Sequence, residues 1–204
     1  SKNIFEIIEE KDLLVHHPYE SFYTVVEFLN DAAADPDVFT IKQTLYRFSE
    51  DSPIIKALIK AARNGKQVTL IVELKARFDE ENNIKLAKNL EKSGINIVYG
   101  FISLKIHCKI SLVIRKDKNK FKYFTHLSTG NYHFKTARQY TDLSLFTCSK
   151  AIGLDANSLL NFITGSNNLN QGAESYQDKQ SPQLKHLIIS PFNLRNFISN
   201  KINQ

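Results

Sequence analysis

Residues 38–73 read VFTIKQTLYRFSEDSPIIKALIKAARNGKQVTLIVE and contain, in order, the patterns of a strand, a helix and a second strand. The β-branched and aromatic residues over 38–46 predict the first strand, and the apolar run over 67–73 predicts a buried parallel strand. Between them, Ser52 is a typical N-cap and Pro53 suits the first position of a helix. This stretch therefore predicts a βαβ unit, in which a helix joins two parallel strands.

The same alternation continues downstream of this unit. Residues 79–93 have a helical pattern that Gly94 would end, and residues 95–99 form a further apolar strand. An extended segment over 13–15 and a helix that starts near Pro18 precede the unit. The order βαβαβ is typical of a layered α/β domain.

The second half of the chain has more strand patterns than helix patterns. Strands are predicted over 105–115, 121–127, 140–148 and 185–190, and helices over 155–164 and 193–202. The predicted fold class is therefore α/β, with a mixed sheet whose first half is βαβαβ and with helices on both faces.

The chain divides into three predicted segments, of which residues 1–165 form the main domain. Residues 166–183 are rich in Asn, Gln, Gly and Ser and predict a linker or disordered loop. Residues 184–204 contain one βα unit, which is too short to fold alone and is expected to be the truncated start of a following domain. Because the sequence contains no Met and begins at Ser1, we expect a piece of a longer protein.

The composition excludes several classes of protein. With 42% hydrophobic and 24% charged residues, the 204-residue chain is neither disordered nor collagen-like. Its net charge of +6 favours a polyanionic partner without identifying one. Two cysteines, Cys108 and Cys148, fit neither a disulfide scaffold nor a zinc site, so both are expected to be small buried residues. A cytoplasmic location is expected, and no apolar run is long enough to span a membrane.

Lys105, His107 and Lys109 alternate along a predicted strand, which would place all three side chains on one face. Two ammonium groups beside one imidazole would lower its pKa, keep a nitrogen free to attack, and hold a phosphate. Histidine is an established covalent nucleophile. The alternative is a solvated strand face on which the histidine has no special role.

Two arginines follow the predicted strands of the first half. Thirty residues separate Arg47 from Arg77, and thirty more separate Arg77 from His107. This is about the length of a βα unit, so the three residues are expected at the same edge of the sheet, where open α/β sheets bind ligands. Arginine forks suit phosphate oxygens, although surface arginines in loops are the simpler interpretation of each residue alone.

Other polar residues carry weaker signals. Ser128 to Asn131 form a glycine-containing turn that can present N–H groups and an amide to an anion. Tyr140 can flank a nucleotide base or pack at a strand edge. His16 and His17 precede a predicted helix and are interpreted as capping or surface residues. The chain has no P-loop, no protein-kinase motif and no dinucleotide fingerprint.

Taken together, five ordered segments resemble bacterial polyphosphate kinase of the first type, and the resemblance covers about 12–165 and resumes at 187–195. The five segments are His16–Phe22, Ile41–Arg47, Glu73–Asn83, Leu104–Lys109, and Thr129–Tyr132 continuing through Tyr140–Asp142. The resemblance implies the first of two C-terminal catalytic domains, each similar to a phospholipase D half. It also implies reversible transfer of the terminal phosphate of ATP to inorganic polyphosphate through a phosphohistidine.

By this resemblance His107 is the phosphorylated nucleophile and Lys109 is its catalytic neighbour. Tyr140 matches a nucleotide-contacting position, while Arg47 and Arg77 match positions that the family associates with Mg²⁺. Since a guanidinium has no lone pair for a cation, we expect both arginines to bind phosphates that Mg²⁺ bridges.

Lys105 and Asn131 complete the expected set of ATP- and phosphate-binding residues. The resemblance also implies ATP or ADP, polyphosphate, the remaining domains of the same enzyme and a homo-oligomer of the full-length protein as partners, without DNA. The location it implies is cytoplasmic, and peripheral association with the inner membrane stays open. The isolated chain is expected to be inactive or nearly so.

Three other interpretations compete with this one, and in one of them the chain only scaffolds the oligomer of the full enzyme. A binding module for nucleic acid or another polyanion would explain the positive charge equally well. A phospholipase D-like phosphodiesterase is the enzymatic alternative, but its pattern requires Asp five residues after the Lys, where this chain has Ile114.

Overall fold

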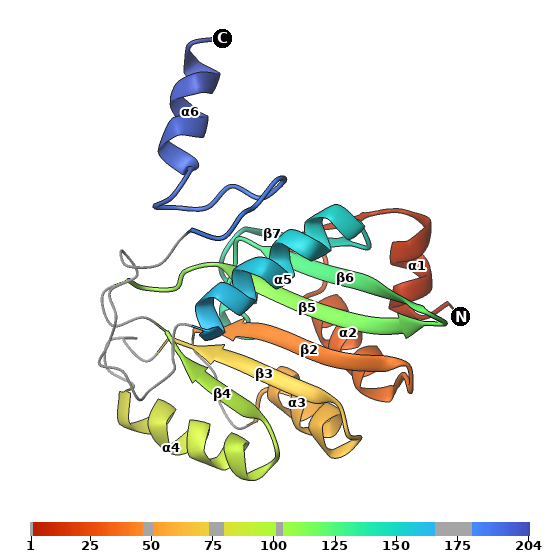
Figure 1. Ribbon diagram of the computed structural model, residues 1–204. Coiled ribbons are helices and arrows are strands. Elements are labelled where there is room, and N and C mark those ends of the chain that lie inside the picture. Colours follow the sequence, from red (N-terminus) through yellow and green to blue (C-terminus); the bar gives the residue numbers. More distant parts are fainter. Residues whose placement is uncertain (1, 47–50, 74–79, 101–103, 166–180) are drawn as a thin grey trace.

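The computed structural model describes residues 2–46, 51–73, 80–100, 104–165 and 181–204 (Figure 1). Within these residues, seven strands form one sheet in the order β1-β7-β6-β5-β2-β3-β4. The strands are β1 (Leu13–His17), β2 (Val38–Leu45), β3 (Gln67–Val72), β4 (Asn96–Tyr99), β5 (Lys109–Asp117), β6 (Lys120–Ser128) and β7 (Asp142–Thr147). β2, β3 and β4 are parallel, and the other neighbouring pairs are antiparallel, so the prediction of a mixed sheet is confirmed.

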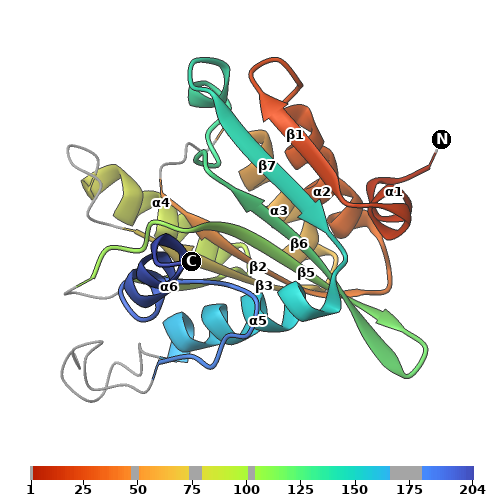
Figure 2. The same cartoon turned by 90° about the horizontal axis from the view of Figure 1, so that it is seen from above.

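Helices cover both faces of the sheet, as predicted (Figures 1 and 2). The described helices are α1 (Ile4–Glu10), α2 (Tyr23–Ala34), α3 (Pro53–Arg63), α4 (Glu80–Lys92), α5 (Lys150–Gly165) and α6 (Leu194–Ile202), with a short 3₁₀ helix, η1, at Thr136–Arg138. Of these, α6 projects away from the sheet (Figure 1). One core cluster joins α1, α2 and α3 to the sheet, and the second lies under α5 on the opposite face. None of the described helices combines the length and apolar composition of a membrane span.

The two core clusters follow from strand alternation. Phe124 of β6 and Phe146 of β7 are fully buried with Phe28 of α2 on one face. On the other face, Leu112 of β5 packs in the same cluster as Leu160 of α5. Fully burying such side chains contributes roughly 1.5–3 kcal/mol each. The sheet is therefore held between two apolar layers.

The antiparallel strand β5 brings a second segment to the carboxyl edge of the parallel strands. Ser111 of β5 lies opposite Gln43 of β2, so the start of β5 at Lys109 lies beside the end of β2 at Leu45. β3 ends at the same edge, because its last residue pairs with Leu45. The residues that lead into β5, including His107, therefore lie at the edge where open α/β sheets bind ligands.

The structure overturns the predicted strand conformation around the histidine. Residues 105–108 have no regular secondary structure, and β5 begins only at Lys109. The backbone N–H of Ile106 donates a hydrogen bond to the carboxylate of Glu73 at 3.0 Å. Cys108 is exposed as a residue, so the prediction that it is a buried residue is also wrong, although burial of its thiol raises the pKa of that group to about 11. Strand alternation is therefore not what positions the two lysines relative to the histidine.

Residues 185–190, also predicted as a strand, form none. The backbone N–H groups of residues 185, 186 and 187 instead donate to Oδ2 of Asp155 at 2.9, 2.6 and 2.9 Å. Burial acts to raise the pKa of Asp155, but these three hydrogen bonds outweigh it and hold the pKa below its ordinary value. The carboxylate thus ties this segment to α5, and the division into domains at 165 and 184 stays a prediction.

The helices differ from the predictions mainly at their starts. α2 begins at Tyr23, while Pro18 lies in the turn after β1. α1 was not predicted, although Asn3 and Glu6 form a capping box at its start. The end of α3 is as predicted, because Gly65 follows the helix with a φ of 80°, a conformation that favours glycine.

A glycine in α5 allows the helix to approach β6 closely. A Cβ on Gly153 would lie 2.2 Å from the Cβ of Tyr123. Gly153→Ala is therefore expected to lower the free energy of unfolding by about 1–3 kcal/mol, because the helix must move off the sheet. The matched control is Gly165→Ala in the same helix, where an added Cβ meets no heavy atom within 4 Å. Denaturant unfolding of both variants measures the effect, and equal stabilities would contradict this account.

Candidate active site

A cavity of about 370 Å³ opens beside the start of β5, at the carboxyl edge of the parallel strands. It is lined by Tyr46, His107, Lys109, Thr129, Gly130, Asn131, His133, Thr136, Tyr140, Thr141 and Asp142. These residues come from the end of β2, the segment before β5, and the connection between β6 and β7. The structure thus brings four of the predicted site residues, His107, Lys109, Asn131 and Tyr140, to one cavity.

The closest contact in this cavity joins the histidine to a lysine. Nζ of Lys109 lies 3.0 Å from Nε2 of His107 and donates to the backbone carbonyl of His107 at 2.6 Å. His107 is exposed, whereas Lys109 is buried. An ammonium group has only donors, so Nε2 is the acceptor and the neutral imidazole carries its proton on Nδ1. The contact therefore selects the tautomer whose lone pair is on Nε2.

The same pair of residues tunes the protonation of the site. The charge of Lys109, followed by burial, lowers the pKa of His107 below its ordinary value. Burial also lowers the pKa of Lys109, while Cys108 and Asp142 act to raise it. A lowered pKa keeps the imidazole neutral at physiological pH, which is the form that acts as a nucleophile.

The loop after β6 is fixed to the start of β7 through Asp142, a residue that the sequence analysis did not single out. Thr129 Oγ1 donates to Oδ1 of Asp142 at 2.8 Å and accepts from the backbone N–H of Leu143 at 3.0 Å. A Cβ on Gly130 would lie 2.5 Å from Oδ2 of Asp142, so only glycine allows so close an approach. The loop therefore holds the neighbouring Asn131 at the cavity wall.

Two aromatic rings and one amide complete the cavity wall. The ring of Tyr46 stands nearly perpendicular to the imidazole of His107, with their centroids 6.2 Å apart. Tyr140 is 63% exposed, and its ring is therefore accessible to a ligand. Oδ1 of Asn131 is buried and has no hydrogen-bond partner among the described residues. The cavity thus combines a nucleophile, an ammonium, an amide and an exposed aromatic ring.

Three of the predicted site residues are not placed at this cavity. Lys105 is exposed and does not line it. Arg47 and Arg77 lie outside the described residues, so their convergence on this cavity stays a prediction. The strands that precede the two arginines do end side by side, since the backbone N–H of Glu73 donates to the carbonyl of Leu45 at 3.1 Å.

Two buried histidines were missed by the sequence analysis. The interpretation of His17 as a capping or surface residue is wrong, because only 1% of it is exposed. His126 is fully buried; burial, with the nearby His17, lowers its pKa to about 3, and its Nδ1 lies 2.8 Å from the hydroxyl of Tyr132. Each histidine lies two residues after a buried apolar residue of the same strand, Val15 for His17 and Phe124 for His126. Because alternate residues of a strand share a face, this spacing could have predicted that both histidines are buried.

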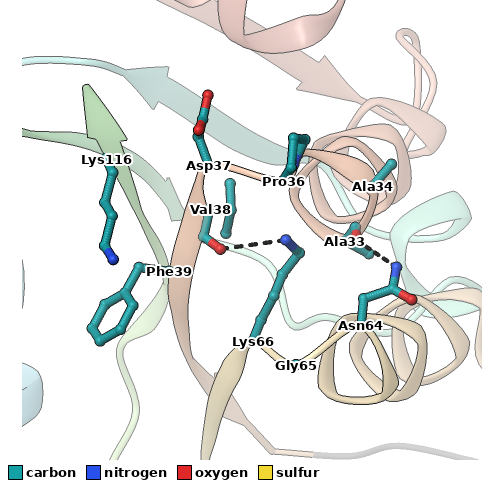
Figure 3. Close-up of a pocket in the computed structure, with 10 residues that line it drawn as sticks. All are labelled: Ala33, Ala34, Pro36, Asp37, Val38, Phe39, Asn64, Gly65, Lys66 and Lys116. Atoms are coloured by element: carbon teal, nitrogen blue, oxygen red, sulfur yellow. Dashed lines mark hydrogen bonds between the residues drawn. The ribbon is translucent and has the colours of Figure 1, made fainter. Parts of the chain in front are cut away.

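A larger cavity, of about 490 Å³, lies at the opposite end of β2 (Figure 3). Lys66 is buried in its wall and donates to the backbone carbonyls of Asp35 and, at 3.3 Å, Val38. Nζ of Lys116 lies 5.1 Å from the centroid of the Phe39 ring. The Lys66 ammonium thus stabilises the turn between α2 and β2. None of the predicted site residues lines this cavity, so the cavity beside the histidine is the candidate active site.

Known proteins resemble this chain over nearly its whole length. Residues 3–169 match the family model described as polyphosphate kinase C-terminal domain 1. The chain is 50% identical over 202 residues to a polyphosphate kinase of Halalkalibacterium halodurans, covering 99% of this chain and 27% of that protein. It is 48% identical over 203 residues to a polyphosphate kinase of Streptomyces coelicolor, covering 99% and 26%. The chain therefore spans about a quarter of the length of these relatives.

Solved structures agree with the sequence relatives. The crystal structure of polyphosphate kinase from Porphyromonas gingivalis superposes with a TM-score of 0.84 at 38% identity, covering 100% of this chain and 32% of that one. NucT from Helicobacter pylori superposes with a TM-score of 0.58 at 17% identity, covering 76% of this chain and 96% of that one. The likeness to NucT concerns the fold alone. The predicted phospholipase D-like α/β fold class is confirmed by the match to polyphosphate kinase.

Proposed function

The chain belongs to the polyphosphate kinase C-terminal domain 1 family, and from this premise we propose that it is the first C-terminal catalytic domain of a longer polyphosphate kinase. The enzyme would transfer the terminal phosphate of ATP reversibly to inorganic polyphosphate, with His107 as the phosphorylated residue. The observation that carries this proposal is the ammonium of Lys109, 3.0 Å from Nε2 of His107, at the wall of the cavity.

The reaction proceeds in two displacements. The lone pair of Nε2 attacks the γ-phosphorus of ATP, a P–N bond forms, and the bond to the β,γ-bridging oxygen breaks, so that ADP leaves with the electron pair. A terminal oxygen of polyphosphate then attacks the same phosphorus, a P–O bond forms and the P–N bond breaks. The polyphosphate is then longer by one phosphate, and the free imidazole of His107 is regenerated. In the reverse direction the same two steps make ATP.

The side chains around Nε2 have complementary roles in these steps. Lys109 keeps its proton and turns its N–H hydrogen bond from Nε2 of His107 to an oxygen of the transferred phosphoryl group, where its charge stabilises the transition state. Asn131 can turn its amide so that the NH₂ group meets another phosphate oxygen. Tyr140 offers its exposed ring to the nucleotide. Lys105, Arg47 and Arg77 bind phosphates further along the substrates.

Mg²⁺ is proposed to enter this site together with the substrate. Among the residues that the structure describes, no group of three or more His, Cys, Asp or Glu side chains could hold a metal ion. The described side chain that contacts Nε2 is a cation, and guanidinium groups have no lone pair to offer a metal. We therefore propose that Mg²⁺ is bound by the phosphate oxygens of the nucleotide, as in MgATP, with no protein site of its own in the described part of the chain.

The test of this function uses the full-length protein that contains the chain. Incubation with ATP, Mg²⁺ and a short polyphosphate primer should lengthen the primer and release one ADP for each phosphate added. The primer lengths are followed by gel electrophoresis and the ADP by chromatography. Release of ADP without lengthening would identify an ATPase and contradict the proposal.

The isolated chain is expected to bind phosphate-rich ligands weakly and to have little kinase activity. The relatives are about four times longer, and in-line transfer tolerates little displacement of the reacting groups, since about 1 Å can cost about 100-fold in rate. Salt should weaken the binding, because exposed charges are screened over roughly 8–10 Å. The measurement compares primer lengthening by the isolated chain and by the full-length protein. Comparable turnover would show that the rest of the protein is dispensable.

The phosphodiesterase alternative is disfavoured by the environment of Ile114. This residue occupies the position at which the phospholipase pattern requires Asp, and it packs in the apolar cluster under α5. A carboxylate is thus absent from that position of β5. The proposed cellular setting is the cytoplasm, the partners are ATP or ADP, polyphosphate and the remaining domains, and assembly of the full-length protein into a homo-oligomer is part of the proposal.

A further inference from the structure

A buried histidine far from His107 in the sequence is linked by hydrogen bonds to the loop of the candidate site. β1 pairs with β7 so that His17 lies opposite Asp142. Nδ1 of His17 lies 2.9 Å from the carbonyl oxygen of Glu20, and its Nε2 lies 3.0 Å from Oγ of Ser144. A carbonyl can only accept, so Nδ1 carries a proton and both ring nitrogens are engaged.

Two further hydrogen bonds continue from this histidine to the cavity. The hydroxyl groups of Ser144 and Ser128 are 3.3 Å apart. Ser128 Oγ accepts the backbone N–H of Gly130 at 3.0 Å. Three successive hydrogen bonds thus join the imidazole of His17 to the backbone of Gly130, and the next residue, Asn131, lines the cavity.

We propose that His17 is a positioning residue for phosphoryl transfer, which acts through Ser144 and Ser128 on the loop that carries Asn131. This inference rests on the proposed function, because it assigns His17 to the same reaction. The hydrogen bonds to Glu20 and Ser144 fix the ring in two directions, and the serine hydroxyls pass this constraint to the loop.

Two separate sets of hydrogen bonds hold the loop, one to Asp142 and the other through Ser144 to His17. Thr129 is fixed to Asp142 on the side that faces the cavity. Ser128 is held by a separate set of contacts, through Ser144 and the buried imidazole. Without the contacts through Ser144 and His17, the loop can turn about its hydrogen bond to Asp142, and the amide of Asn131 moves relative to the phosphoryl group.

The experiment measures the full-length enzyme with His17→Ala, Ser144→Ala and the double variant. Each single variant is expected to lower kcat about tenfold, with a smaller change in the KM for ATP, because alignment is lost and ground-state binding is largely kept. The double variant should be no slower than the slower single variant, since both changes break the same chain of contacts. His17→Gln, whose amide can still bond to Ser144, should recover part of the lost kcat.

His16→Ala is the matched control, because His16 is the neighbouring histidine and is exposed. It should keep the full kcat. If His17→Ala keeps the full kcat, or if the effects of His17→Ala and Ser144→Ala multiply in the double variant, the inference is wrong and His17 is only a core residue. Failure of the proposed function gives a different result, in which the unmodified enzyme does not lengthen polyphosphate or His107→Ala stays active.

Discussion

Replacing His107 by alanine is expected to abolish polyphosphate synthesis by the full-length enzyme, with a loss on the order of 10⁴-fold or more in kcat. Losses of this size follow when a covalent nucleophile is removed, because the remaining groups can bind the substrates but cannot form the intermediate. The side chain is exposed, so its removal should leave the fold and the melting temperature unchanged.

The measurement for this variant is the rate of primer lengthening, together with the melting temperature. His16→Ala serves again as the control, because it removes an exposed imidazole that lies outside the cavity. A His107→Ala enzyme that still lengthens polyphosphate at more than a hundredth of the normal rate would exclude a phosphohistidine at this position.

Lys109→Met is expected to lower kcat about 100-fold and to change its pH dependence. The loss in rate follows from removing one charge that stabilises the transferred phosphoryl group. The change in pH dependence follows because Lys109 is the main cause of the lowered pKa of His107. Without this charge the pKa of the imidazole rises towards its ordinary value of 6.5, so a larger fraction is protonated and unreactive in mildly acidic solution. The acid limb of the rate profile therefore moves to higher pH.

The rate of histidine phosphorylation by ATP, measured as a function of pH, tests this second prediction. Lys116→Met is the matched control, since Lys116 lies on the same strand but lines the cavity at the opposite end of β2. It should leave the acid limb in place. An acid limb that moves to lower pH in Lys109→Met, or does not move, would show that Lys109 does not control the protonation of His107.

Much of the fold was predictable because the decisive signals are local. Apolar runs of strand length, the Ser52-Pro53 helix start and the positive-φ glycines at 65 and 94 marked β2, α3, β3 and β4 within a few residues. Residues 105–108 and 185–190 were wrongly predicted as strands for the same reason. In both segments backbone N–H groups are taken by a carboxylate distant in sequence, Glu73 for Ile106 and Asp155 for residues 185–187. Such tertiary contacts leave no trace in the local pattern.

The candidate site was predictable to a similar extent. His107, Lys109, Asn131 and Tyr140, which the resemblance singled out, line one cavity, although the strand alternation that first pointed to the two lysines does not hold. Asp142 and His17 were missed because their importance depends on the pairing of β1 with β7. That pairing joins segments more than a hundred residues apart, and periodicity within either strand cannot reveal it.

The central claim is that phosphate becomes covalently bound to His107, and the most direct test is to locate it. The full-length enzyme is mixed with ATP and Mg²⁺ without polyphosphate, stopped in alkali because phosphohistidine is labile in acid, and digested for mass spectrometry. The account predicts one acid-labile phosphate on the peptide that contains His107, bound at Nε2, which disappears when polyphosphate is added before the stop. An active enzyme that carries no phosphate on this peptide, or carries it on another residue, would contradict the account.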